Sequence, residues 1–110
     1  MNLYKEFHGD IVTSEIGKRL RAICQKEKVA FKIMTGYGAT SLRSNSKVAA
    51  LSSLRNMQKQ GIIKAYLPGE IRNQILKENS TFYKYKADYE QVVKSDADYG
   101  NDGIIFVFVK

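Results

Sequence analysis

Apolar residues follow two different periods along the first two thirds of the chain. Residues 2–7 alternate polar with apolar side chains, and residues 29–34 and 62–67 are short runs rich in apolar residues, as strands are. Between these runs, apolar residues recur every three or four positions, which is typical of an amphipathic helix. The pattern therefore predicts strand, helix, strand, helix, strand over residues 2–67.

The two predicted helices have clear apolar stripes. The first runs from about Asp10, with Asp10, Thr13 and Ser14 as equal candidates for its N-cap. The second runs from about Ser46 and stops at Gly61. The residues expected to face the core are Val12, Ile16, Leu20, Ile23 and Cys24 in the first helix and Val48, Leu51, Leu54 and Met57 in the second.

The last third of the chain is less regular. Pro68-Gly69 closes the third strand, residues 70–80 allow a short helix, and residues 82–93 fit either a strand or a helix. Residues 103–110 contain six consecutive apolar residues, which is typical of a strand covered on both faces. We therefore expect the last strand to lie between earlier strands. Residues 70–100 form either a lid over a site or only the connection to that strand.

Length and composition favour a single α/β domain over residues 1–110. Strands that alternate with helices favour parallel pairing with right-handed crossovers. The chain shows no pattern of a signal peptide or a membrane span. Its single cysteine, on an apolar stripe, suggests a buried thiol in a reducing compartment. We expect a cytoplasmic monomer.

The net charge of +7 is concentrated in one segment. Residues 28–69 contain no Asp or Glu, whereas residues 1–27 and 70–110 have nearly balanced charges. Such a segment favours contact with a polyanion such as nucleic acid, the alternative being a solvated basic face. Its seven cations are Lys28, Lys32, Arg43, Lys47, Arg55, Lys59 and Lys64.

Residues 32–47, KIMTGYGATSLRSNSK, form a candidate phosphate-binding loop within that segment. Gly36 and Gly38 let backbone N–H groups approach an anion, and the loop leads into a helix N-terminus. Arg43 and Lys47 would add positive charge. A plain turn between strand and helix explains the two glycines equally well.

His8 follows the first predicted strand as Thr35 follows the second. If these strands are parallel, Glu6, His8, Thr35 and the glycine loop lie at one edge of the sheet, where α/β proteins bind ligands. The alternative is a structural imidazole in a turn.

The inventory of metal ligands is small. One histidine and one cysteine do not suffice for a zinc site of the usual kind. The acids Asp96, Asp98 and Asp102 are compatible with Mg²⁺, but a solvated turn is favoured there. We therefore expect no metal and no cofactor.

Four segments together resemble a known family: EFHG, IMTGYGATS, GIIKAYLPGE and DADYGNDGIIFVFVK. They look like a stand-alone Smr domain, the small MutS-related module, over nearly the whole chain except residues 70–95. The resemblance implies an α/β two-layer sandwich, β-α-β-α-β-β with a mixed sheet, similar to the C-terminal domain of translation initiation factor three. It also implies nucleic-acid binding, and in several members endonuclease activity on DNA or RNA.

The resemblance assigns roles to particular residues. His8 and Gly9 match the His-Gly of the family's first motif, and Glu6 stands where the family usually has Asp. The implied catalytic pair is His8 and Glu6. Lys5 stands where the family usually has Leu. The implied substrate or phosphate contacts are Thr35, Gly36, Tyr37 and Gly38 of the TGxG motif, with Arg43 and Lys47 beside them.

Two functions follow as hypotheses. The first is an endonuclease, in which His8 acts as general acid or base and RNA supplies its own 2′-OH, whereas DNA requires an activated water, usually with a metal. The second is a non-catalytic RNA- or DNA-binding module, with the ribosome as a candidate partner. There Tyr37, Tyr66 and Tyr83 either stack on bases or, as we favour, pack within the fold. A third reading is a protein-interaction domain with an incidental basic face.

Overall fold

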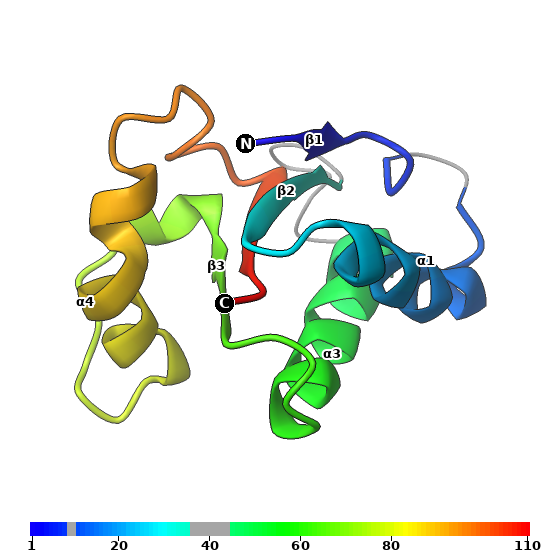
Figure 1. The fold of residues 1–110 in the computed structure, drawn as a ribbon. Helices are drawn as coiled ribbons and strands as arrows, with labels where there is room; N and C mark the ends of the chain where they lie inside the picture. The colour runs from blue at the N-terminus through cyan, green and yellow to red at the C-terminus, as the bar shows by residue number, and fades with distance from the viewer. Residues whose placement is uncertain (9–10, 36–44) are drawn as a thin grey trace.

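The computed structural model describes residues 1–8, 11–35 and 45–110 of the chain (Figure 1). Within these residues, no helix is both long enough and apolar enough to cross a membrane. The strands are β1 (Leu3–Tyr4), β2 (Ala30–Met34), β3 (Ala65–Pro68) and β4 (Ile104–Phe108). The helices are α1 (Thr13–Lys26), α3 (Asn45–Lys59), the short 3₁₀ helix η1 (Gly69–Asn73) and α4 (Thr81–Val93).

The four strands form one mixed sheet in the order β1-β2-β4-β3. β1 pairs with β2 in parallel, and β4 pairs antiparallel with both β2 and β3. β1, β2 and β3 therefore run in the same direction, and only β4 runs against them. The prediction that the last strand lies inside the sheet is confirmed, and all five of its residues are buried.

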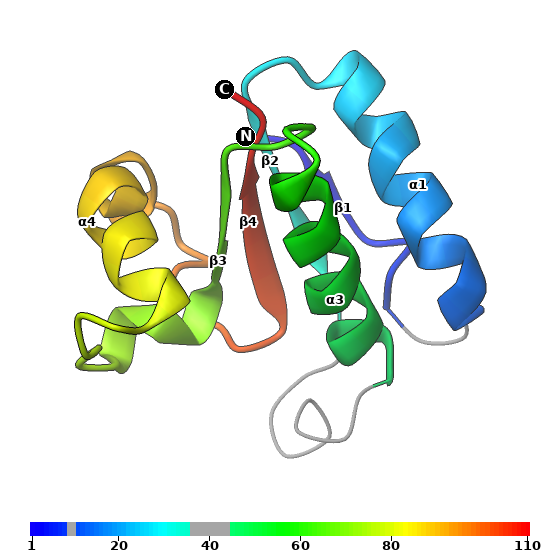
Figure 2. The ribbon, with the colours of Figure 1, turned by 90° about the horizontal axis from the view of Figure 1, so that it is seen from below.

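Helices α1 and α3 pack side by side on one face of the sheet (Figure 2). Together with the sheet they make the expected α/β sandwich, and the expected order β-α-β-α-β-β is confirmed, with η1 and α4 lying between β3 and β4. Cys24 lies in this core, where burial raises the pKa of its thiol to about 11. The larger side chains of the core are Phe7, Ile16, Leu20, Ile23, Phe31, Ile33, Leu54, Met57, Ile63, Tyr66, Ile105 and Val107.

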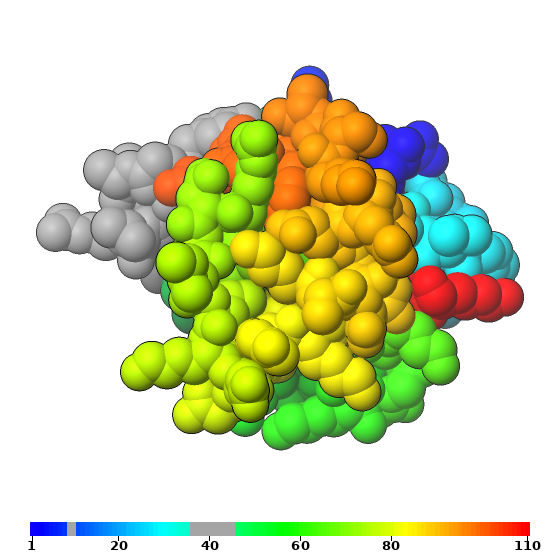
Figure 3. Space-filling model, turned by 90° about the vertical axis from the view of Figure 1, so that its left-hand side faces the viewer, coloured from blue at the N-terminus to red at the C-terminus, as the bar shows by residue number. Residues whose placement is uncertain are grey.

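The other face of β3 and β4 is covered by residues 69–102 (Figure 3). The Tyr89 ring of α4 stacks on Phe108 with ring centroids 4.4 Å apart. Tyr99 packs edge-on against Phe106, at 6.0 Å. Residues 70–100 therefore do more than connect β3 to β4, because α4 and the loop after it bury the second face of the sheet.

The first strand is shorter than its alternating pattern predicts. β1 ends at Tyr4, and the chain then turns, with His8 N–H donating to the Lys5 carbonyl at 3.1 Å. The turn brings Phe7 into the core, where it is fully buried, and this burial outweighs two or three further residues of strand pairing.

The helix starts also differ in detail from the prediction. Val12 is the N-cap of α1, without a capping side chain, and 62% of it is exposed, so neither Thr13 nor Ser14 caps this helix. Asp10 lies outside the described residues. In α3, Leu54 and Met57 are buried as expected, but Val48 is 62% exposed and Ala50 is buried instead. Gly61 ends the helix with a φ of 78°, as expected of its stop.

Candidate functional site at the carboxyl edge of the sheet

β1, β2 and β3 all end at one edge of the sheet, which we call the carboxyl edge. Tyr4, the last residue of β1, lies opposite Ile33, one residue before the end of β2. The expected parallel pairing is therefore confirmed, and the strand ends that precede His8 and Thr35 are level with one another. β4 begins at this edge, and the N-terminal ends of α1 and α3 lie there too (Figure 2).

His8 is presented by the turn that follows β1. Phe7 anchors the turn in the core, whereas the side chains of Glu6 and His8 on either side of it are exposed. Alternation about a buried aromatic residue thus brings two polar side chains to the surface. Gly9, which matches the same motif, lies outside the described residues.

Glu6 has an ion-pair partner that the sequence did not indicate. Its carboxylate accepts a hydrogen bond from Arg19 Nη1 of α1 at 2.6 Å. The side chains of Arg19 and Glu6 are 52% and 37% exposed, so solvent screens the pair. The sequence does not reveal this ion pair, because Arg19 faces β1 only when α1 is packed in the fold.

Thr35 links the candidate loop to the sheet. It is fully buried, and its backbone N–H donates to the Gly103 carbonyl at 2.7 Å. Its hydroxyl also lies within hydrogen-bond distance of that carbonyl, at 3.3 Å. Thr35 therefore fixes the start of the TGYG segment against the beginning of β4.

Lys47 makes contacts within the fold at the same edge. Its ammonium donates to Glu70 Oε2 at 2.6 Å and to the Asp102 carbonyl at 2.8 Å, and its side chain is only 8% exposed. These bonds join the first turn of α3 to η1 and to the residues before β4. The other oxygen of that carboxylate, Glu70 Oε1, is buried and accepts no hydrogen bond from the described residues. The phosphate contact expected of Lys47 stays a prediction.

The other predicted site residues of the loop lie outside the described part of the chain. They are Gly36, Tyr37, Gly38 and Arg43. Their expected role in phosphate binding therefore stays a prediction as well, and the described part of the site consists of the residues that flank them.

The carboxylates considered for Mg²⁺ are engaged with a lysine. Lys32 Nζ lies 2.9 Å from Asp96 Oδ1 and 2.7 Å from Asp98 Oδ2. Burial opposes ionisation of Asp96, but hydrogen bonds from the Asp98 N–H and from Lys32 outweigh it and lower the pKa of the carboxyl group. No cluster of three potential metal ligands occurs within the described residues.

Two of the tyrosines considered for base stacking are described. Tyr66 is buried, with ring centroids 5.4 Å from Phe82 and 5.8 Å from Tyr85, so it packs as we favoured. Tyr83 is 42% exposed on α4. Tyr37 lies outside the described residues.

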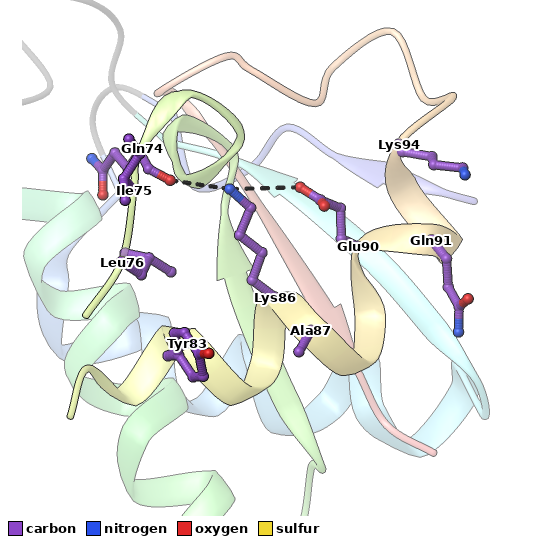
Figure 4. A pocket seen from close by; sticks show the side chains of 9 residues that line it. All are labelled: Gln74, Ile75, Leu76, Tyr83, Lys86, Ala87, Glu90, Gln91 and Lys94. Atoms are coloured by element: carbon purple, nitrogen blue, oxygen red, sulfur yellow. Dashed lines mark hydrogen bonds and ion pairs between the residues drawn. The ribbon is translucent and has the colours of Figure 1, made fainter. Parts of the chain in front are cut away.

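Two of the hollows in the described surface bear on the site. One, of about 240 Å³, lies between β1 and α1 and is lined by Tyr4, Glu6, Arg19, Ala22, Ile23 and Lys26. The other, of about 520 Å³, lies between α4 and residues 74–76, and Lys86 spans it with bonds to the Gln74 carbonyl and to Glu90 (Figure 4). Only the first contains a predicted site residue, Glu6.

Comparisons with known proteins give no match. No protein-family model, no curated protein and no solved structure matches this chain.

Proposed function

We propose that the chain is a nucleic-acid-binding domain of the Smr type that cleaves phosphodiester bonds of RNA or DNA at the carboxyl edge. The parallel pairing of β1 with β2 carries the proposal, because it brings the segment of His8 and the start of the TGYG segment to the same edge of the sheet. The described residues of two of the four segments that carry the resemblance, His8 and Thr35, thus follow strands that end at one edge, which α/β proteins commonly use for ligands.

His8 is the proposed general acid or base. Imidazole is well suited to exchange protons near neutral pH, and the His8 side chain is exposed to an incoming substrate. On RNA, His8 takes the proton of the 2′-OH as the 2′-oxygen bonds to phosphorus, and the 5′-oxygen leaves with a proton from water. On DNA, His8 takes a proton from water as the water oxygen bonds to phosphorus, and a deoxyribose oxygen leaves with a proton from a second water. Cleavage of RNA therefore requires fewer catalytic groups from the protein than cleavage of DNA does.

Arg19 adds a cation near the turn that carries His8, through its ion pair with Glu6. Glu6 holds its guanidinium at 2.6 Å, two positions before His8 in the chain. A guanidinium fixed in this way suits the binding of a phosphate or the stabilisation of negative charge on it. Glu6 would then act by positioning Arg19 as well as by acting on His8.

The same ion pair favours a second candidate function, a binding module without chemistry. A carboxylate already neutralised by Arg19 has less influence on a neighbouring imidazole than a lone one. In that case the carboxyl edge binds the phosphate backbone and leaves it intact.

Cleavage assays with two variants of the same turn separate these functions. Labelled single-stranded RNA, the same RNA with 2′-deoxy residues, and supercoiled DNA are incubated with wild type, His8→Ala and Lys5→Ala, with and without EDTA. We expect wild type and Lys5→Ala to cleave RNA, and His8→Ala to lose at least about a hundredfold in rate while it still binds. Lys5 is the matched control because it is exposed in the same turn.

Two results would decide against cleavage by His8. If His8→Ala cleaves as fast as wild type, the proposed mechanism is wrong. If neither protein cleaves but both bind, the chain is a binding module.

A further inference from the structure

The outer face of the α1–α3 layer carries cations and small polar side chains. We call it the helix face, and its exposed polar residues are Lys18 and Arg21 of α1 and Ser52, Arg55, Asn56 and Lys59 of α3, with the exposed Val48 on the same stripe of α3. α1 contains a single acid, Glu15 in its first turn, and α3 contains none. The basic residues of this face therefore come from two helices and not from one continuous segment of the chain.

The two helices present these side chains on one continuous surface. Gly17 of α1 lies so close to α3 that a Cβ there would be 3.4 Å from Ser53 Oγ. One turn along, Arg21 Nη2 lies 3.3 Å from Gln60 Oε1, just beyond the end of α3. Both helices start at the carboxyl edge, so the helix face extends away from the candidate site (Figure 2).

The opposite side of the molecule has a different balance of charge. Residues 70–102 contain five Lys or Arg and seven Asp or Glu, a net charge of 5 − 7 = −2. Of the seven cations in the acid-free segment, Lys32 and Lys47 are bound by acids of this C-terminal part. Helices α1 and α3 together contain seven Lys or Arg and one Glu, a net charge of 7 − 1 = +6, although other exposed lysines such as Lys28 and Lys64 lie outside them.

We propose that the helix face binds the sugar-phosphate backbone of a nucleic acid strand whose scissile phosphate lies at the carboxyl edge. This inference rests on the proposed function. Lys and Arg neutralise phosphates, and Ser and Asn donate hydrogen bonds to phosphate and sugar oxygens without reading sequence. The helix face includes one exposed aliphatic residue, Val48, and none of the aromatic or long aliphatic side chains that an interfacial membrane helix requires. Nucleic acid is therefore favoured over an anionic lipid surface.

Two quadruple variants with the same change in net charge test the proposal. The helix-face variant is K18Q/R21Q/R55Q/K59Q, and the control variant is K77Q/K84Q/K94Q/K110Q, whose lysines are all exposed and away from the helix face. Each binds a labelled single-stranded 2′-O-methyl RNA of about 20 nucleotides over a series of salt concentrations. Wild-type protein is also mixed with phosphatidylserine vesicles. Thermal unfolding checks that both variants are folded.

The helix-face variant is expected to lose about three units from the slope of log affinity against log salt, since each phosphate contact on a single strand contributes about 0.7. At about 0.1 M salt its affinity should fall by on the order of a hundredfold or more. The control variant should retain the wild-type slope. Equal losses in both variants, or a wild-type slope in the helix-face variant, would overturn the proposal, as would wild-type binding to vesicles but not to RNA.

Failure of this inference is distinguishable from failure of the proposed function. If wild type cleaves RNA and depends on His8, but the helix-face variant binds with an unchanged slope, only the helix-face proposal fails. If the helix-face variant loses binding while His8→Ala still cleaves, the binding surface stands and the catalytic role of His8 fails.

Discussion

Lys32 is the residue that most directly ties the C-terminal loop to the sheet. Its side chain lies on β2, only 12% exposed, and bonds to Asp96 and Asp98, which follow α4. In the sequence these two acids looked like a solvated turn and Lys32 like part of a basic surface. Neither charge pattern nor spacing reveals an ion pair between residues 64 positions apart, because it depends on how α4 returns the chain to the sheet.

Replacement of Lys32 by Met should destabilise the protein at neutral pH. The variant leaves two partly buried carboxylates without their cation, and we expect a loss of about 2 kcal/mol in the free energy of unfolding. The lowered pKa of Asp96 means that its contribution is present at neutral pH and is lost as the pH falls through that pKa. Urea unfolding of wild type and Lys32→Met at pH 7 and at acid pH measures both effects.

The difference between the two proteins should therefore shrink in acid. Lys94→Met, which removes an exposed lysine near the same loop, should behave like wild type at every pH. A constant difference between wild type and Lys32→Met from neutral pH to about pH 2 would show that the ion pairs do not act as described.

The elements of the fold were predictable to the extent that local pattern determines them. The central place of β4 followed from its uninterrupted apolar run, since such a strand needs cover on both faces. The apolar pattern did not predict which side of α3 faces the core. The first turn of α3 directs Lys47 inward to Glu70 and leaves Val48 exposed. A buried lysine does not fit the hydrophobic pattern of the helix, and the ion pair of Lys47 with the distant Glu70 explains its burial.

Helix α4 shows the same limit. Its tyrosine-rich sequence fitted strand and helix equally, and only Val93 of its residues is fully buried. Phe82, Tyr85 and Tyr89 are partly buried against the sheet, so they give no clean helical stripe. The sequence could thus predict that residues 70–100 return to β4, but not that they cover the second face.

Gly69 offers a test of how the elements meet at the carboxyl edge. A Cβ at this position would lie 2.0 Å from the Asn101 carbonyl oxygen, so Gly69→Ala must displace backbone between η1 and β4. We expect it to destabilise the protein by about 3 kcal/mol or more. Gly61→Ala, where a φ of 78° is unfavourable but nothing lies within 4 Å, should cost only about 1 kcal/mol. Denaturant unfolding of both variants measures which of them loses more free energy of unfolding.

A reversed order would contradict the close approach of η1 to the loop before β4. In the sequence, Pro68-Gly69 reads as an ordinary turn. In the structure, position 69 requires a glycine because a backbone segment more than thirty positions later in the chain lies close to it.

The whole molecule has two sides with different chemistry. The carboxyl edge and the helix face meet at the N-terminal ends of α1 and α3, and residues 70–102, with a net charge of 5 − 7 = −2, cover the other side. The sequence predicted the basic segment and the shared edge of His8 and Thr35. It missed Arg19, Glu70 and the helix face, because each of them depends on contacts between elements far apart in the chain.

Amide chemical-shift mapping would show directly whether nucleic acid binds at the carboxyl edge. A 2′-O-methyl RNA that resists cleavage is titrated into ¹⁵N-labelled protein, and shift changes are followed residue by residue. We expect the largest changes around His8 and Thr35 and along the outer face of α1 and α3, with little change in α4. Changes confined to α4 and residues 74–76, or none at any RNA concentration, would contradict binding at this edge.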